Sequence, residues 1–187
     1  MSDQHERGVV IVSGVPGAGK TSVAHLLAQR FVRAAHIEAD ALQNMIVAGG
    51  LWPGQEPIDE GYRQLSLRAK NSSLLADSFF AHGFTPIIDD IVIGTRIDEY
   101  LGYLTSSPVY LVLLQPSLEV LERRNELRDK GDAFHQAVAL HEVADKAADV
   151  GLVIDNSEQD VEATVHEIEQ RLWQEGCIRS TLADPDR

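Results

Sequence analysis

Cysteine is almost absent from the sequence: Cys177 is the only one among 187 residues. A single cysteine cannot form a disulfide within the chain, and such sparing use fits a reducing compartment. Long hydrophobic runs are also missing. The longest, VVIV at 9–12 and VYLVLL at 109–114, have the length of a strand and are too short to cross a bilayer. Since the N-terminal MSDQHERG also lacks the apolar middle of a signal peptide, we expect a cytoplasmic protein with no membrane partner.

Basic residues are scarce as well. The chain has 16 lysines and arginines against 29 aspartates and glutamates, which gives a net charge of −13. Duplex binding depends on neutralising phosphates with cationic side chains, so this charge argues against nucleic acid as a partner. A hydrophobic content of 44% is enough for a packed core. Because there is no clear linker or repeat, we expect one domain over 1–187, either a monomer or a homodimer.

Short apolar segments alternate with helical ones along the chain. The predicted strands are 9–13, 34–38, 85–91, 109–114 and 152–154. The predicted helices are 20–31, 41–48, 58–82, 96–104, one that starts at 116–117, and 158–175. Continuous apolar strands between helices are typical of a parallel sheet with helices on both faces, an α/β fold in three layers. The tail from about 176 to 187 is expected to be flexible.

The segment GVPGAGKT at 14–21 matches the pattern G-x-x-x-x-G-K-[ST]. Its glycines let backbone N–H groups wrap around phosphate oxygens, and the helix that follows adds its positive N-terminal end. A glycine-rich turn without a ligand is the alternative, but the apolar strand before the segment and the amphipathic helix after it favour phosphate binding. Lys20 is predicted to contact the β- and γ-phosphates, and the Thr21 hydroxyl to bind Mg²⁺. The predicted cradle consists of Gly14, Val15, Pro16, Gly17, Ala18, Gly19, Lys20, Thr21 and Ser22.

Acidic residues follow two of the predicted strands. Asp40 comes just after the second strand, where it could accept a proton from an attacking hydroxyl or, alternatively, cap the next helix. Asp89 and Asp90 end the third strand and are expected to face opposite ways, because side chains alternate along a strand. One of them, Asp89 in our assignment, is predicted at the metal, and Asp90 is predicted to reach the substrate. The alternative for this pair is a turn signal at a strand end.

Arginines gather in ERRNELRDKGD at 122–132. Arg124 and Arg128 are four positions apart and would share one face of a helix. They could close over the triphosphate as a lid and stabilise charge during phosphoryl transfer, or they could simply form a solvated charged face. Beside a phosphate-binding loop, the lid is the favoured interpretation.

Taken in order, GVPGAGKT, IEAD at 37–40, IIDDIVIG at 87–94, the arginine segment and IDNS at 154–157 resemble the small P-loop kinases. The resemblance is closest to their chloramphenicol-phosphotransferase-like branch, whose members are often labelled AAA-type ATP-binding phosphotransferases. It implies a P-loop NTPase fold with a five-stranded parallel sheet in the order 2-3-1-4-5 and a small helical lid over about 122–140. It further implies ATP and Mg²⁺, and transfer of the γ-phosphate to a hydroxyl of an antibiotic, a sugar-type compound or another metabolite.

The resemblance also assigns roles to residues of this chain. Lys20, Asp40, Arg124 and Arg128 match catalytic positions, with Asp40 as the base. Asn156 lies where such kinases contact the adenine, while Arg63 and Arg96 are candidates for the acceptor site.

Three alternatives bear on this function. A GTPase would need a guanine-reading N-K-x-D, but 155–158 reads DNSE. A polynucleotide 5′-hydroxyl kinase and a non-catalytic nucleotide-binding regulator stay open, although the charge of −13 disfavours the first. The segment GGLWPGQEP at 49–57 departs from the chloramphenicol-binding segment, which leaves the acceptor open. Its Trp52 either forms part of the acceptor pocket or packs the loop.

Overall fold

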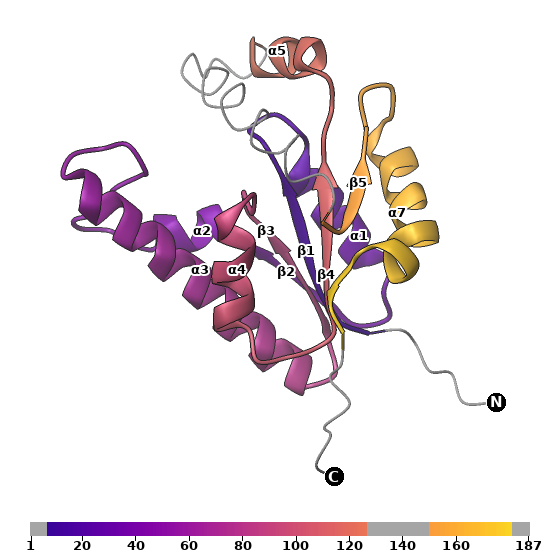
Figure 1. The fold of residues 1–187 in the computed structure, drawn as a ribbon, viewed down its shortest axis with the longest axis horizontal. Helices are drawn as coiled ribbons and strands as arrows, with labels where there is room; N and C mark the ends of the chain where they lie inside the picture. The colour runs from indigo at the N-terminus through magenta and orange to yellow at the C-terminus, as the bar shows by residue number, and fades with distance from the viewer. Residues whose placement is uncertain (1–6, 127–149, 181–187) are drawn as a thin grey trace.

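The computed structural model describes residues 7–126 and 150–180. Its central feature is a parallel sheet in the order β2-β3-β1-β4-β5, drawn in Figure 1. The strands are β1 (Val9–Gly14), β2 (Ala34–Glu38), β3 (Thr85–Asp89), β4 (Val109–Leu114) and β5 (Leu152–Ile154). The three-layer α/β fold and the strand order predicted from the sequence are therefore confirmed.

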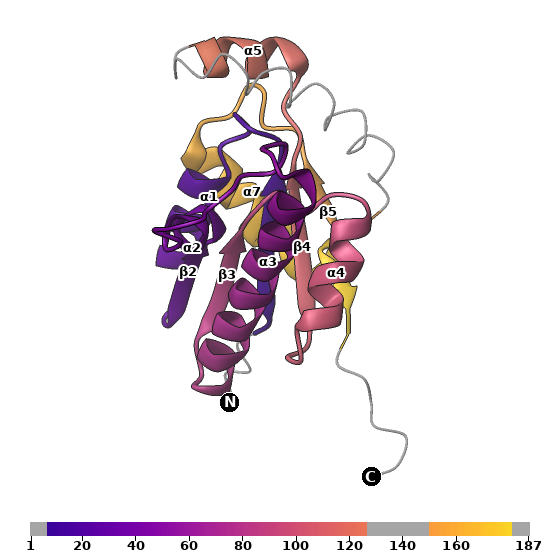
Figure 2. The same cartoon turned by 90° about the vertical axis from the view of Figure 1, so that its left-hand side faces the viewer.

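Helices cover both faces of this sheet (Figures 1 and 2). Helices α1 (Lys20–Gln29) and α7 (Val161–Glu175) pack their apolar side chains on one face. Helices α3 (Ile58–Ala81) and α4 (Thr95–Tyr103) pack theirs on the other. None of the helices in the described ranges is long and apolar enough to span a membrane.

The three central strands are buried along their whole length, which explains their continuous apolar sequence. Every residue of β1, β3 and β4 is buried, because helices lie above and below them. Side chains of alternating residues enter different cores: Ile87 joins the core under α1 and α7, whereas Ile88 joins the core under α3 and α4. The same alternation continues to the end of β3 and fixes where Asp89 and Asp90 point.

Two further helices lie near the carboxyl ends of the strands, where α/β proteins bind ligands. Helix α2 (Ala39–Asn44) follows β2 directly, and α5 (Leu118–Glu126) follows β4. Helix α2 begins and ends earlier in the chain than the predicted helix 41–48, and it is shorter. A loop connects it to α3. The predicted lid over 122–140 is described only as far as 126, so Arg128 lies outside the described residues.

The predicted flexible tail is wrong for its first residues. Cys177–Arg179 forms a sixth strand, β6, which pairs antiparallel with β4 at Val109 and Tyr110. Strand β5 pairs only with Val112–Leu114 of β4, so the first half of the same edge is free for β6. A three-residue strand carries no periodicity, and its pairing partner is far away in sequence, so the local pattern did not reveal it.

Candidate active site

The loop between β1 and α1 has the backbone of a phosphate cradle. Gly17 and Gly19 have φ values of 91° and 95°, which side-chain-bearing residues rarely adopt. A Cβ on Gly14 would lie 2.7 Å from the carbonyl oxygen of Leu114, so this position also demands glycine. The glycines predicted to shape the loop are therefore needed both for its turn and for its close approach to β4.

The N-terminus of α1 is open toward solvent. Its N-cap, Gly19, supplies no side chain to the first-turn N–H groups, and the first turn contains no acidic residue. Thr21 and Ser22 are exposed in this turn, while the Lys20 ammonium donates a hydrogen bond to the carbonyl oxygen of Val15, at 3.3 Å. Uncapped N–H groups, a helix dipole and an ammonium together suit an anion such as a phosphate.

Residues of α5 and of the segment after β5 contact the phosphate loop from a second side. The buried Asn156 amide donates to the carbonyl oxygen of Ala18, at 3.0 Å. Arg124 donates to the same carbonyl at 3.5 Å and to the carbonyl oxygen of Asn156 at 3.1 Å. Arg124 thus reaches the phosphate loop, as the lid interpretation requires. Asn156 supports the loop itself, and its predicted contact with adenine remains a prediction.

The two adjacent aspartates do face opposite ways, as predicted. Asp89 lies on the α1 side, where its Oδ2 is 3.6 Å from Nε2 of His36. Asp89 is buried, and its Oδ2 has no hydrogen-bond partner among the described residues. An unsatisfied buried carboxylate oxygen costs free energy unless a cation or water joins it, which suits a metal-bound water. Its predicted place at the metal is therefore chemically reasonable.

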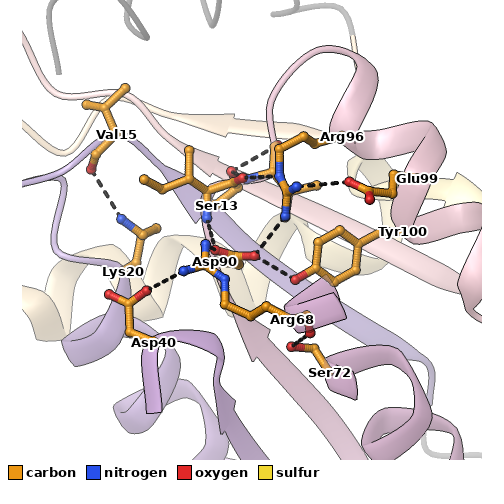
Figure 3. A network of polar contacts seen from close by, with 12 residues as sticks. Ser13, Val15, Lys20, Asp40, Arg68, Ser72, Asp90, Arg96, Glu99 and Tyr100 are labelled. Atoms are coloured by element: carbon orange, nitrogen blue, oxygen red, sulfur yellow. Dashed lines mark hydrogen bonds and ion pairs between the residues drawn. The ribbon is translucent and has the colours of Figure 1, made fainter. Parts of the chain in front are cut away.

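Asp90 lies on the other face and is the centre of a buried polar network (Figure 3). Its Oδ1 accepts from Arg68 at 2.5 Å and from the backbone N–H of Ile91 at 2.8 Å. Its Oδ2 accepts from the Tyr100 hydroxyl at 2.7 Å and from Arg96 at 3.2 Å. This network joins α3 and α4 to the residue that follows β3, at the edge of the sheet where the phosphate loop also lies.

The ionisation state of Tyr100 follows from its surroundings. Burial and the adjacent Asp90 carboxylate raise the pKa of Tyr100 well above its ordinary value of 10.0. Tyr100 therefore stays a neutral donor at physiological pH. Its hydroxyl can therefore donate to Asp90 Oδ2 in the neutral form.

Asp40 is connected to the same network through Arg68. Its Oδ1 accepts from Nη1 of Arg68 at 3.0 Å, while 62% of its side chain is exposed. The alternative role as a helix cap is wrong, because the N-cap of α2 is Glu38 and Asp40 lies inside the first turn. Asp40 is thus a solvent-accessible carboxylate held by a buried guanidinium, and it can receive a proton from a bound molecule.

Other predicted residues lie apart from this arrangement. Arg63 is largely exposed on α3, pairs with Glu60 at 3.4 Å and lines a shallow surface pocket with Asp59, Tyr62 and Ser66. It does not join the network around Asp90, whereas the other acceptor candidate, Arg96, does. The role of Arg63 toward the acceptor stays a prediction.

Sequence reasoning missed Arg68, the residue that joins Asp40 to Asp90. Only 5% of Arg68 is exposed, and it lies on the buried face of α3 with Gly61, Gln64 and Ser72. A signal was present, because an arginine on the apolar side of a long amphipathic helix must have an anionic partner. The sequence alone did not say which carboxylate that partner was.

Comparisons with known proteins agree with this fold. Residues 9–150, about three quarters of the chain, match the AAA domain family. Among solved structures, the chain is similar to a sugar kinase from Janibacter sp., with 20% identity and a TM-score of 0.61 over 88% of this chain and 94% of that one. It is also similar to a gluconokinase from Sinorhizobium meliloti, with 20% identity and a TM-score of 0.61 over 87% and 90%. No curated sequence matches significantly.

Similarity at this identity shows the fold alone, and the predicted P-loop NTPase fold is confirmed. The narrower resemblance to the chloramphenicol-phosphotransferase-like branch remains a prediction.

Proposed function

The chain belongs to the AAA domain family, and from this premise we propose that it is an ATP-dependent kinase that phosphorylates a hydroxyl group of a small molecule. The observation that carries the proposal is the position of Asp40. An accessible carboxylate, fixed by a buried arginine, lies at the same edge of the sheet as the phosphate loop. Figure 3 draws Lys20 and Asp40 on the same side of the Asp90 network. A purely nucleotide-binding protein has no use for such a base.

Each residue has a part in the transfer. The acceptor hydroxyl gives its proton to Asp40 while its oxygen forms a bond to the γ-phosphorus of ATP. The bond from that phosphorus to the bridging oxygen breaks, and the electron pair leaves with ADP. Lys20 and the first-turn N–H groups of α1 stabilise the charge on the phosphates. Arg124 and Arg128 are proposed to do the same from the lid.

Mg²⁺ fits the residues present. Thr21 and Asp89 would hold it, the latter through water, and the ion would neutralise charge on the β- and γ-phosphates. The unsatisfied Oδ2 of Asp89 is the structural observation in favour of this assignment. In the described ranges, no three His, Cys, Asp or Glu side chains are grouped to hold a metal ion.

The test is a search for the product. The protein is incubated with Mg·ATP and a mixed panel of antibiotics, sugars, sugar acids, nucleosides and short 5′-hydroxyl oligonucleotides, and products are detected by mass spectrometry. We expect one phosphorylated small molecule, whose formation falls about 10²- to 10⁴-fold in Asp40→Asn because the base is lost.

Other outcomes of the same experiment separate the alternatives. A phosphorylated oligonucleotide would show that the net charge does not predict the acceptor. Bound and intact ATP with every acceptor would favour a nucleotide-binding regulator. Turnover that is equal in Asp40→Asn would remove Asp40 from the mechanism.

A further inference from the structure

The loop between α2 and α3 places an aromatic ring beside the proposed base. Trp52 is 39% exposed, and the Cζ atom of Arg68 lies 5.8 Å from the centre of its ring. The same guanidinium donates to Asp40. Trp52 and Asp40 are therefore neighbours of one guanidinium, and a molecule with one hydroxyl at Asp40 lies within reach of the exposed part of the Trp52 side chain.

Two buried glutamines hold this loop in place. The Gln64 amide donates to the carbonyl oxygen of Gly49 at 2.8 Å and accepts from the backbone N–H of Leu51 at 2.7 Å. The Gln43 amide donates to the carbonyl oxygen of Leu51 at 2.9 Å. Burying two side-chain amides costs desolvation free energy, which their hydrogen bonds offset only while the loop keeps this one conformation. The ring of Trp52 is thus presented by a preorganised segment, and this favours a role in the acceptor pocket over loop packing.

The charges around Asp40 leave little room for an anion. Arg68 is shared by Asp40 and Asp90, and Arg96 by Asp90 and Glu99. Two guanidiniums thus face three carboxylates. A carboxylate or phosphate on the acceptor would meet the charge of Asp40 with no cation in excess among the described residues of this network.

The site therefore combines an aromatic ring with an accessible carboxylate, and within the described part of the chain its network holds no cation in excess.

We propose that the acceptor is an uncharged, ring-shaped polyhydroxy compound, that is, a sugar in its pyranose form or a cyclitol, whose less polar face packs on Trp52. This inference rests on the proposed kinase function for the fate of the hydroxyl, but not for the recognition itself. It names Trp52 as a residue that determines specificity, while Asp40 remains the base.

Binding is tested by tryptophan fluorescence in the presence of ADP and Mg²⁺. The probes are matched in size: D-glucose and myo-inositol as uncharged rings, D-glucuronate as a charged ring, D-gluconate as a charged open chain, and D-sorbitol as an uncharged open chain. We expect a saturable change in emission with the uncharged rings alone. The change should disappear in Trp52→Phe, since Trp173 packs against Phe31 and Tyr110 and serves as an internal reference.

Steady-state kinetics provide the second measurement. With an uncharged ring as acceptor, Trp52→Leu should raise KM about tenfold and leave kcat within about twofold, because packing is lost and the base is kept. Trp52→Phe should recover part of the loss. The matched control is Phe79→Leu, a partly exposed aromatic near the C-terminal end of α3 that should leave KM unchanged.

The results separate this inference from the proposed function. Phosphoryl transfer with a KM that is insensitive to Trp52, or a preference for D-glucuronate or D-gluconate, would overturn the inference and leave the kinase standing. Fluorescence binding of rings without any transfer would support the recognition and overturn the kinase. No change in Trp52 emission with any of the five compounds would overturn the inference as well.

Discussion

The phosphate loop and the network around Asp90 lie at the same edge of the sheet, yet backbone groups form the first and side chains form the second. The loop over 14–22 is one continuous segment that works through backbone N–H groups, glycine conformations and a helix end. The network consists of charged and phenolic side chains from α2, α3 and α4 and from Asp90, the residue that follows β3. One half is therefore specified locally, and the other only by tertiary structure.

The difference has energetic consequences. The loop needs no special side chain to supply its N–H donors, because the backbone provides them. The strand before the loop and the helix after it fix the positions of these groups, so ordering them costs little free energy. Arg68 and Asp90 are both buried and must be paired to remain there. We expect changes in the loop to affect mainly nucleotide handling, and changes in the network to affect stability and acceptor handling.

The largest effect is expected for Lys20→Ala. Removing the ammonium from the loop should lower phosphoryl transfer on the order of 10³-fold, as for other cations that stabilise a transferring phosphoryl group, and should weaken ATP binding. Global stability should change little, since Lys20 is outside both apolar cores. Turnover by coupled assay, ATP affinity by calorimetry and urea unfolding measure the three quantities. Unchanged ATP affinity and turnover would show that the loop is not a nucleotide site.

The corresponding change in the network around Asp90 is Arg68→Met. The side chain keeps its length but leaves Asp90 without one of its charged partners inside the protein. We expect a loss of about 3–5 kcal/mol in the free energy of unfolding, measured by urea denaturation, with nucleotide affinity retained in the folded fraction.

The control for Arg68 is available on the same helix. Arg63→Met removes an exposed arginine whose partner, Glu60, is also partly exposed, so stability should change by no more than about 0.5 kcal/mol. The double change Arg68→Met with Asp90→Asn should recover part of the loss, because no charge is then left unpaired. Equal stability of Arg68→Met and Arg63→Met would mean that the network is not a structural ion pair.

The phosphate loop and the network around Asp90 also differ in how far the sequence predicts them. The strand order came from a family resemblance, and the loop residues came from a local pattern with a strict geometric reason for each glycine. Asp40, Asp89 and Asp90 were found because carboxyl ends of parallel strands share one edge. Arg68 was missed because its partners come from other elements, and β6 because three residues carry no pattern. Pairings between distant elements are what a single sequence does not specify.

A smaller effect tests whether the two halves share one scaffold. Asp77 on α3 accepts hydrogen bonds from Thr105 and Ser106, which follow α4, so it joins the two helices that carry Arg68 and Arg96. Burial opposes ionisation of Asp77, but these hydrogen bonds outweigh it and hold its pKa below the ordinary value of 3.8. Asp77→Asn should lower the free energy of unfolding by about 1 kcal/mol at pH 7 and leave ATP affinity unchanged.

The pH dependence gives this last prediction its sign. Because the pKa of Asp77 is depressed in the folded state, its ionisation stabilises the fold above pH 3.8, and that contribution is lost as the pH falls below this value. The stability difference between the wild type and Asp77→Asn should therefore be constant near neutrality and shrink in acid. Thr105→Val, which removes only one of the donors, should show a smaller difference with the same trend. Urea unfolding at several pH values measures this, and a difference that grows in acid would contradict the assigned role of Asp77.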